Sequence, residues 1–425
     1  MKKQLLLLAA ACLLGMSNLT AQTNGRNCGT MGHLQQQLNA DPTLQQRMDQ
    51  VEQFTQNYLA SQAALKTTTV VTIPVVFHVL YSTNNATQNI SDARINEQLH
   101  VLNLDYSRTN ADAGNTPAVF QGISVNTNIQ FCLAVRDPNG AATTGIIRKL
   151  TGTTSFIDDD GVKFNAQGGD DAWPAGSYLN LWVCNLGGGL LGYAQFPGGP
   201  ANTDGVVVLN ESVGGPAAPG TATSYNLGRT ATHEVGHWLN LRHVWGDANC
   251  GNDLVSDTPT QQTSNFGCPS FPHVTCSNGP NGDMFMNYMD YVDDNCMNAF
   301  TAGQSSRSNA LLISGGARFS LTTSQGCSPV GGGCGIPGSL SATSVAQTSA
   351  TVNWGAVSGA TTYTLQYRVS GGTLTTVGNL TTTSKALSGL TAGTVYDYHV
   401  KAVCSGTSGT YSAYSHFTTT SGGGC

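Results

Sequence analysis

The segment from His233 to His243 constrains this chain more than any other, and it reads HEVGHWLNLRH. His233 and His237 are four residues apart, so on a helix their imidazoles project from one face and are placed to ligate one metal ion. Glu234 lies beside the first histidine, within reach of a water in an open coordination position. The spacing therefore predicts a helix that carries a zinc site and a carboxylate base.

The third histidine requires the helix to end. His243 follows His237 by six residues, which is too far for the same helical face, so it becomes a ligand only if the chain turns back. Asn240 stands where that turn falls, and Asn is the non-glycine residue that most readily takes a positive φ. A buried helix with incidental histidines is the alternative. Packing alone does not explain why three of the nine histidines fall within this window.

A family resemblance follows from these residues. The pattern HExxHxx(G)xxH resembles that of the metzincin zinc proteases, which add a methionine turn further along the chain. The stretches HEVGHWLNLRHVWGD and SDTP…MNYMDY are similar to the pappalysin family, in its cytophagalysin-like branch. The similarity runs from about residue 73 to residue 312. The family usually has Gly at the position of Asn240, and Asn is the replacement with the smallest conformational cost.

The resemblance implies a fold and an activity. The fold is an α/β (α+β) metzincin-like catalytic domain, with a twisted mixed sheet and a long active-site helix. The activity is that of a secreted zinc endopeptidase acting on protein or peptide substrates, in which Glu234 takes a proton from the zinc-bound water. A non-catalytic secreted adhesin with a structural zinc is the alternative, although structural sites usually take four protein ligands.

Residues near the methionine turn receive roles from the same resemblance. Met289 is expected to form a hydrophobic floor beneath the ligand imidazoles. Tyr291 is expected to assist near the reacting carbonyl. Asp294 is expected to line the pocket for the residue after the scissile bond, which would favour a basic side chain there.

The N-terminus predicts export and latency. A basic start, a short apolar run and a small-residue site predict a signal peptide over residues 1–21. Residues 22–67 are polar, with a helix expected over 41–64, and are interpreted as a pro-segment whose removal point is a candidate at Lys66. A thiolate from Cys28 would fill the open zinc position and displace the water, which the resemblance supports. A free or intermolecularly paired thiol is the alternative.

The catalytic domain is expected over residues 68–326. β-Branched and aromatic runs predict strands over 70–81, 128–135, 179–184, 190–196 and 205–209. Ser91 predicts a helix start, and the helix with the zinc motif begins near Arg229. In the family, an edge strand such as 190–196 holds an extended peptide above the metal, through main-chain hydrogen bonds.

The C-terminal part predicts a second module. Residues 327–337 contain a run of three glycines and are interpreted as a linker. Residues 338–420 alternate short strands and turns and resemble an all-β fibronectin type III sandwich, with Tyr396 as its tyrosine-corner residue. Nothing in this module suggests chemistry, so a spacer or a weakly adhesive role is expected.

Twelve cysteines in an exported chain favour disulfides. Four of them flank the irregular region between the third histidine and the methionine turn, and their number alone leaves three pairings open. Two others, Cys132 and Cys184, lie in strand-like runs and are expected to be simply buried. The pairs that the resemblance implies are Cys250–Cys276 and Cys268–Cys296.

The charged residues limit the classes of ligand and partner that this chain is expected to bind. Oxygen-bearing side chains in the loop after His243 predict a structural calcium ion, with a solvated acidic loop as the alternative; they are Asp253, Asp257 and Thr258. The net charge of −6, with 18 Lys and Arg spread thinly, argues against nucleic acid as a partner. No segment after the signal peptide is apolar enough to span a membrane. The oligomeric state stays open.

Overall fold

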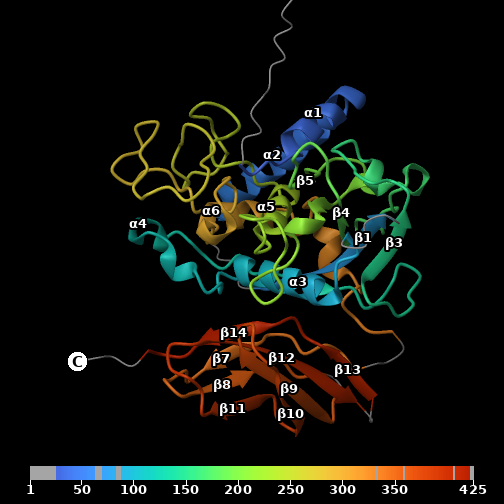
Figure 1. Ribbon diagram of the computed structural model, residues 1–425, viewed down its shortest axis with the longest axis vertical. Coiled ribbons are helices and arrows are strands. Elements are labelled where there is room, and N and C mark those ends of the chain that lie inside the picture. Colours follow the sequence, from blue (N-terminus) through green and yellow to red (C-terminus); the bar gives the residue numbers. More distant parts are fainter. Residues whose placement is uncertain are drawn as a thin grey trace, which may run out of the picture.

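The structure, a computed structural model, describes residues 25–62, 69–82, 88–330, 334–357, 359–404 and 407–421. Two N-terminal helices lie on a mixed α/β unit, and a β-sandwich packs against its opposite side (Figure 1). The expected signal peptide, the candidate cleavage point at Lys66 and the three-glycine run of the linker lie outside the described residues.

A six-stranded sheet forms the framework of the α/β unit. Its strand order is β2-β1-β4-β6-β5, and β3 pairs with the far end of β1. All pairs are parallel except β5 with β6, so β5 is the antiparallel edge. The sequence predicted five of these strands and missed β3, whose residues are mostly half-buried. The strands are β1 Val71–Ser82, β2 Ile129–Leu133, β3 Ile146–Thr151, β4 Leu179–Cys184, β5 Gly192–Ala194 and β6 Val206–Leu209.

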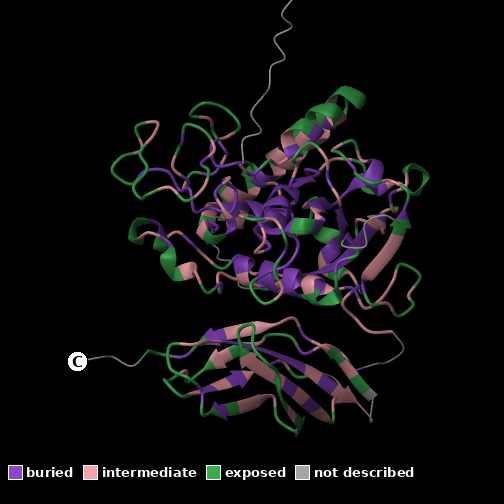
Figure 2. Cartoon of the chain, viewed as in Figure 1, coloured by how far each residue is buried: buried purple, intermediate pink, exposed green. Residues whose placement is uncertain are grey.

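Helices α3 and α5 pack against this sheet and against each other. Helix α3 (Asp92–Tyr106) begins as predicted at Ser91, whose hydroxyl accepts from the Arg94 amide at 3.4 Å. Helix α5 (Arg229–Trp238) is buried along its whole length in the centre of the unit (Figure 2). The Gln98 amide group of α3 donates to the Gly228 carbonyl at 2.9 Å, immediately before α5 begins. The active-site helix is thereby held at its N-terminus.

The N-terminal segment forms two helices, whereas one was predicted over 41–64. Helix α1 covers Thr30–Ala40 and helix α2 covers Leu44–Gln62. The break falls at Asp41, whose carboxylate accepts from the Thr43 amide at 2.9 Å and closes a local turn. Helix α2 packs on α6 (Ala302–Ala310), where Glu52 forms an ion pair with buried Arg307 at 2.8 Å. The segment is therefore folded onto the catalytic unit.

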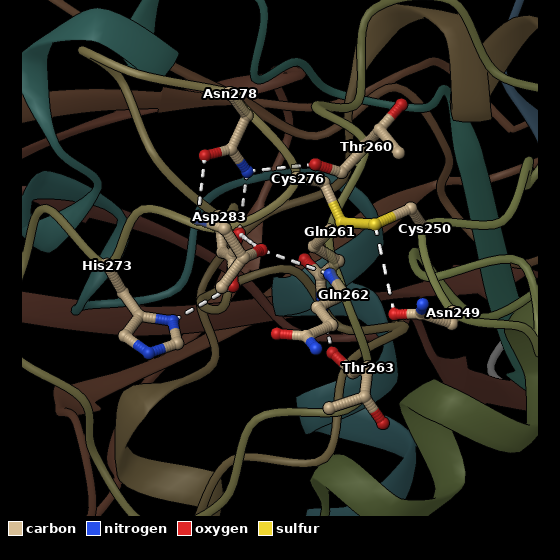
Figure 3. The surroundings of a disulfide bond; sticks show 11 residues. Asn249, Cys250, Thr260, Gln261, Gln262, Thr263, His273, Cys276, Asn278 and Asp283 are labelled. Carbon is tan, nitrogen blue, oxygen red and sulfur yellow. Dashed lines mark hydrogen bonds and ion pairs between the residues drawn. A yellow bond between two sulfur atoms is a disulfide. The ribbon is translucent and has the colours of Figure 1, made fainter.

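An irregular loop after the third histidine is braced covalently. The predicted disulfides Cys250–Cys276 and Cys268–Cys296 are both present. Beside the first of them, the buried Asp283 carboxylate gathers several polar side chains (Figure 3). It accepts from Asn278 at 2.6 Å and from Thr275 at 2.5 Å, and it contacts His273 at 2.9 Å. These bonds hold a region with little secondary structure of its own.

The C-terminal module is a β-sandwich of a five-stranded and a three-stranded antiparallel sheet. The Tyr396 hydroxyl accepts from the Thr391 amide at 2.9 Å, as expected for a tyrosine corner. Its strands are β7 Ser341–Thr343, β8 Ser349–Asn353, β9 Thr362–Val369, β10 Thr375–Leu380, β11 Ser384–Ser388, β12 Val395–Cys404, β13 Thr407–Tyr411 and β14 Ser415–Thr418.

Two further disulfides correct the sequence analysis. Cys132 is not simply buried, because it pairs with Cys327 across 195 positions, whereas Cys184 is buried with a free thiol. A second unpredicted bond joins Cys334 to Cys404 within the sandwich. The expected linker is thus tied to the catalytic unit at its start and to the sandwich near its end.

The sandwich packs against α3 through charged and aromatic side chains. Arg368 lies between Glu97 of α3 at 3.8 Å and Asp397 at 3.3 Å, and His100 of α3 lies 3.5 Å from Asp397. The Tyr414 ring contacts both His100 and Arg368. Among the described residues, no helix is both long and apolar enough to cross a bilayer.

Candidate metal centre

Helix α5 and the turn after it bring three imidazoles together. The Nε2 atom of His237 lies 3.1 Å from that of His233 and 3.1 Å from that of His243. The turn is made at Asn240, whose φ is +68°, as predicted. The Leu241 amide donates to the Gly236 carbonyl at 2.9 Å, which closes the end of the helix. The backbone conformation of this turn therefore places His243 beside His237.

Each imidazole is oriented through its other nitrogen. The Nδ1 atoms of His233 and His237 contact the carbonyls of Tyr288 at 2.7 Å and Leu241 at 2.8 Å. The Nδ1 atom of His243 contacts the carboxylate of Asp247 at 2.5 Å. With Nδ1 donating, the three Nε2 lone pairs face one another, an arrangement that a shared cation stabilises. The donor set therefore fits a metal ion.

Glu234 and Cys28 complete the centre. The Glu234 side chain is buried, and burial raises its pKa to about 7. The hydrogen bonds that the carboxylate accepts lower the pKa, but by less than burial raises it. Those bonds come from the Thr30 hydroxyl at 2.9 Å and the Cys28 thiol at 3.4 Å. In the described part of the chain, the thiol and the three imidazoles form the one group of such donors within 4.8 Å of one another. The Cys28 sulfur therefore lies beside the three imidazoles, where a fourth ligand was predicted.

The segment around Cys28 lies along the edge strand β5. The Gly29 amide donates to the Gly192 carbonyl at 2.8 Å, and the Leu191 amide donates to the Asn27 carbonyl at 2.9 Å. The pairing is parallel. A Cβ atom at Gly192 would lie 2.8 Å from Cγ of Glu234, so glycine is needed where β5 passes over the carboxylate. The N-terminal segment thus occupies the edge that the sequence analysis assigned to a peptide.

Asp294 receives a basic side chain from the same segment. Its carboxylate lies 2.6 Å from the Arg26 guanidinium, with both side chains buried. Arg26 also donates to the Thr230 hydroxyl at 3.2 Å and lies over the Tyr225 ring at 4.9 Å. The other oxygen of Asp294 accepts from the Leu227 amide at 2.8 Å. The carboxylate of Asp294 is therefore paired with a buried guanidinium from the N-terminal segment.

The methionine turn packs against helix α5. Met289 is buried, and a Cβ atom at Gly236 of α5 would lie 2.4 Å from its Sδ atom. The Tyr291 ring lies 5.0 Å from the His243 ring, and burial raises the pKa of its phenol well above the usual range. Between them, the buried carboxylate of Asp290 accepts from the Gln261 side chain at 2.8 Å. Burial raises the pKa of Asp290 to about 6.

Of the candidate calcium residues, Asp253 and Thr258 contact each other, whereas Asp257 contacts the start of α6. Asp257 accepts from the Thr301 hydroxyl at 2.6 Å and the Gly303 amide at 2.8 Å, at the start of α6. Asp253 accepts from the Thr258 hydroxyl at 2.8 Å, and burial raises its pKa to about 6. These hydrogen bonds give each of the three side chains a partner within the protein, and calcium binding stays a prediction of the sequence.

Three residues at this site were not predicted from the sequence. Asp247 orients His243 and stands four residues after it, so the local pattern contained a usable signal. Arg26 stands two residues before Cys28, and Thr30 stands two residues after it. Because Arg26, Cys28 and Thr30 alternate along the chain, this spacing could have indicated an extended segment whose side chains face the site.

Comparisons with known proteins agree with this geometry. A profile of the peptidase M43 family, described as pregnancy-associated plasma protein-A, matches residues 163–313, and a fibronectin type III profile matches residues 335–418. An extracellular metalloprotease of Arthroderma benhamiae is 35% identical over 271 residues, covering 60% of this chain and 84% of the relative. One from Pyricularia oryzae is 33% identical over 248 residues, covering 57% and 75%.

Two solved structures are more similar still. Mature mirolysin of Tannerella forsythia, in complex with a cleaved peptide, is 51% identical and superposes with a TM-score of 0.58. The match covers 60% of this chain and 97% of mirolysin. A mutant of promirolysin from the same organism is 46% identical with a TM-score of 0.64, covering 70% of this chain and 97% of that one.

Proposed function

This chain belongs to the pappalysin family, peptidase M43, and is a metalloendopeptidase; from that premise we propose that its metal is a zinc ion held by His233, His237 and His243. The observation that carries the proposal is the convergence of the three Nε2 atoms, 3.1 Å from His237 to each neighbour, with Glu234 beside them. Imidazole ligands with one position left for exchange are typical of catalytic zinc.

The adhesin alternative is not favoured. A structural zinc site takes four ligands from the folded domain, and the fourth ligand here comes from the N-terminal segment. Without that segment, three histidines and a buried carboxylate remain around an open position. The relatives with similar sequences are named extracellular metalloproteases, which agrees with an enzyme exported through the proposed signal peptide of residues 1–21.

Catalysis divides between the metal and Glu234. A bound zinc ion supplies Lewis-acid chemistry, polarising the substrate carbonyl and making a water molecule more acidic. Glu234 takes a proton from the attacking water and passes it to the departing amine. In the latent chain, with the pro-segment in place, burial raises the pKa of Glu234 to about 7. Tyr291, whose ring lies 5.0 Å from the His243 ring, stabilises the oxygen of the attacked carbonyl.

The cleft binds an extended peptide along β5. In the latent chain the main-chain groups of Leu191 and Gly192 bond to residues 27–29, and a substrate would use the same groups. Asp294 takes the side chain after the scissile bond, and its buried contact with Arg26 supports a preference for a basic residue. A substrate placed in this way runs antiparallel to β5, opposite to the N-terminal segment.

Residues 22–67 act as a pro-segment that keeps the enzyme latent. Cys28 fills the fourth metal position, and the segment covers the edge strand and the Asp294 pocket. The promirolysin structure matches 70% of this chain and mature mirolysin 60%, a difference that supports a removable segment of this size. Removal near Lys66 frees the open position.

One experiment tests the proposal. The full chain is processed by limited trypsin treatment, freed of trypsin, and incubated with casein or gelatin, with and without a zinc chelator. Cleavage is expected to stop with the chelator and to return on adding zinc. Glu234→Ala is expected to retain its zinc, measured by metal analysis, and to lose cleavage. Chelator-resistant cleavage, or equal cleavage by Glu234→Ala, would refute the proposal.

A further inference from the structure

A large aromatic side chain stands exposed on a rigid part of the braced loop. Phe266 leaves 49% of its surface accessible. Its neighbours are fixed: the Asn265 amide donates to Asp290 at 2.8 Å, and the Asp293 amide donates to the Gly267 carbonyl at 2.9 Å. The next residue, Cys268, is held by a disulfide. The loop therefore presents the ring in a defined place without burying it.

The ring lines the part of the cleft that the pro-segment leaves open. This cleft holds about 1200 Å³ between residues 25–27, the 221–225 loop and residues 188–191, which precede β5. The Phe266 ring lies 5.9 Å from the Tyr291 ring. A Cβ atom on Gly25 would lie 2.5 Å from the Cδ1 atom of Phe266, so the pro-segment passes directly against the ring.

The pro-segment therefore marks a position next to the Asp294 pocket. Arg26 fills that pocket, and Gly25, the adjacent residue, meets Phe266. Because a substrate runs in the opposite direction, the residue after its basic side chain arrives where Gly25 lies. We propose that Phe266 is a specificity-determining residue of this protease, forming the subsite for the second residue after the scissile bond and selecting a large apolar or aromatic side chain.

This inference rests on the proposed function, because it takes its substrate direction from the Asp294 pocket. The aromatic surface of Phe266 indicates which substrate side chain would bind there. A substrate side chain that covers Phe266 removes apolar surface from water, and an aromatic one also gains ring–ring contact with Phe266 and Tyr291. Glycine in the pro-segment forgoes this contact, which suits a segment that must leave.

The test is a cleavage profile. The full chain, processed and verified by mass to have lost its pro-segment, is given peptides that share a basic residue after the scissile bond and carry Gly, Ser, Leu, Phe, Asp or Lys at the following position. The wild-type enzyme is expected to cleave the Leu and Phe peptides with a kcat/KM roughly tenfold above the Gly peptide. Phe266→Ser is expected to lose this advantage, so that the ratio of kcat/KM between the Phe and Gly peptides falls toward one.

Phe271→Ser is the matched control. Phe271 lies on the same loop and is 38% exposed, but its ring contacts Phe120 and Phe285 and does not line the cleft. It is expected to keep the wild-type profile. A flat or charge-selective wild-type profile, an unchanged Phe266→Ser profile, or an equal loss in Phe271→Ser overturns the inference while the protease stands. A processed wild-type chain that cleaves none of the peptides overturns both.

Discussion

The Thr30 hydroxyl donates a hydrogen bond to the Glu234 carboxylate at 2.9 Å and accepts one from the Ala194 amide at 2.9 Å, with the Thr30 side chain wholly buried. One pro-segment residue therefore links the catalytic carboxylate to the edge strand. Cys28 lies two residues earlier, beside the three imidazoles. In the proposed latent form, neighbouring residues of the pro-segment therefore act on the metal and on the base.

Thr30→Val is expected to weaken latency even though Cys28 remains. Valine keeps the shape of threonine but leaves the buried Glu234 carboxylate and the Ala194 amide each one partner short, which costs about 1–3 kcal/mol. Casein cleavage by the unprocessed chain is expected to rise above the wild-type background. Thr43→Val, at an exposed turn of the same segment, is the control and is expected to stay latent. An equally silent Thr30→Val chain would show that Cys28 alone imposes latency.

Arg26→Ala is expected to loosen the pro-segment. It strands Asp294, a carboxylate with no exposed surface, and breaking such a buried pair by removing one partner costs about 3–5 kcal/mol. The measurement is the rate at which trypsin releases the pro-segment, which is expected to rise severalfold. Gln45→Ala removes an exposed hydrogen bond within α2 and is expected to change the rate little. Equal rates for the two variants would contradict this account.

Asp247→Ala is expected to lower zinc affinity by about 10- to 100-fold, because a carboxylate that bonds a ligand imidazole orients it and raises its basicity. Its contact with Nδ1 of His243 at 2.5 Å makes it the partner to remove. Asp247→Asn keeps an oxygen acceptor and is expected to recover part of the affinity. Competition with a chelator measures both variants. Wild-type affinity in Asp247→Ala would show that His243 needs no such partner.

Asn240→Gly is expected to leave stability within a few tenths of a kcal/mol, whereas Asn240→Ala is expected to cost about 1–2 kcal/mol. The reason is the φ of +68°, which glycine adopts freely and alanine does not. The Asn240 side-chain nitrogen has no hydrogen-bond partner, so glycine forfeits no bond there. Thermal unfolding measures stability, and zinc content reports whether His243 is still delivered. An alanine variant as stable as the glycine variant would mean that the turn is not strained.

Acid is expected to destabilise the C-terminal sandwich. Burial lowers the pKa of His399 from 6.5 to about 3, and that of His416 likewise. The unfolded chain therefore binds more protons between about pH 6.5 and pH 3, so stability falls as pH falls through this window, by up to about 1.4 kcal/mol per pH unit for each histidine. The His399 ring stacks on the rings of Tyr411 and Tyr414. His399→Phe keeps an aromatic ring in this position but does not titrate.

Unfolding of the sandwich, followed by intrinsic fluorescence from pH 7.5 to 4, checks this prediction. The wild-type midpoint is expected to decrease more steeply than that of His399→Phe. The buried contacts of Asp397 with Arg368 and His100 lower its pKa too, so some acid sensitivity is expected to remain in the variant. Parallel curves for the two proteins would mean that His399 does not sense pH.

Features of the site that depend on local geometry were predicted from the sequence. The helical repeat places His233 and His237 on one face, and the preference of Asn for positive φ places the turn at Asn240. The disulfides of the braced loop followed from resemblance, not from the residues alone. Strand β3 was missed because its side chains are mostly half-buried and show no clear alternation.

By itself, the sequence determined which residues carry the chemistry and how the helix presents them, because those relationships lie within the eleven residues from His233 to His243, part of one helix and the turn after it. Tertiary structure alone decided what surrounds them. Thr30 meets Glu234 across 204 positions, Arg26 meets Asp294 across 268, and Cys132 meets Cys327 across 195. Nothing in the local backbone encodes such contacts; they form only when packing of the whole sheet, its helices and the pro-segment brings distant side chains together.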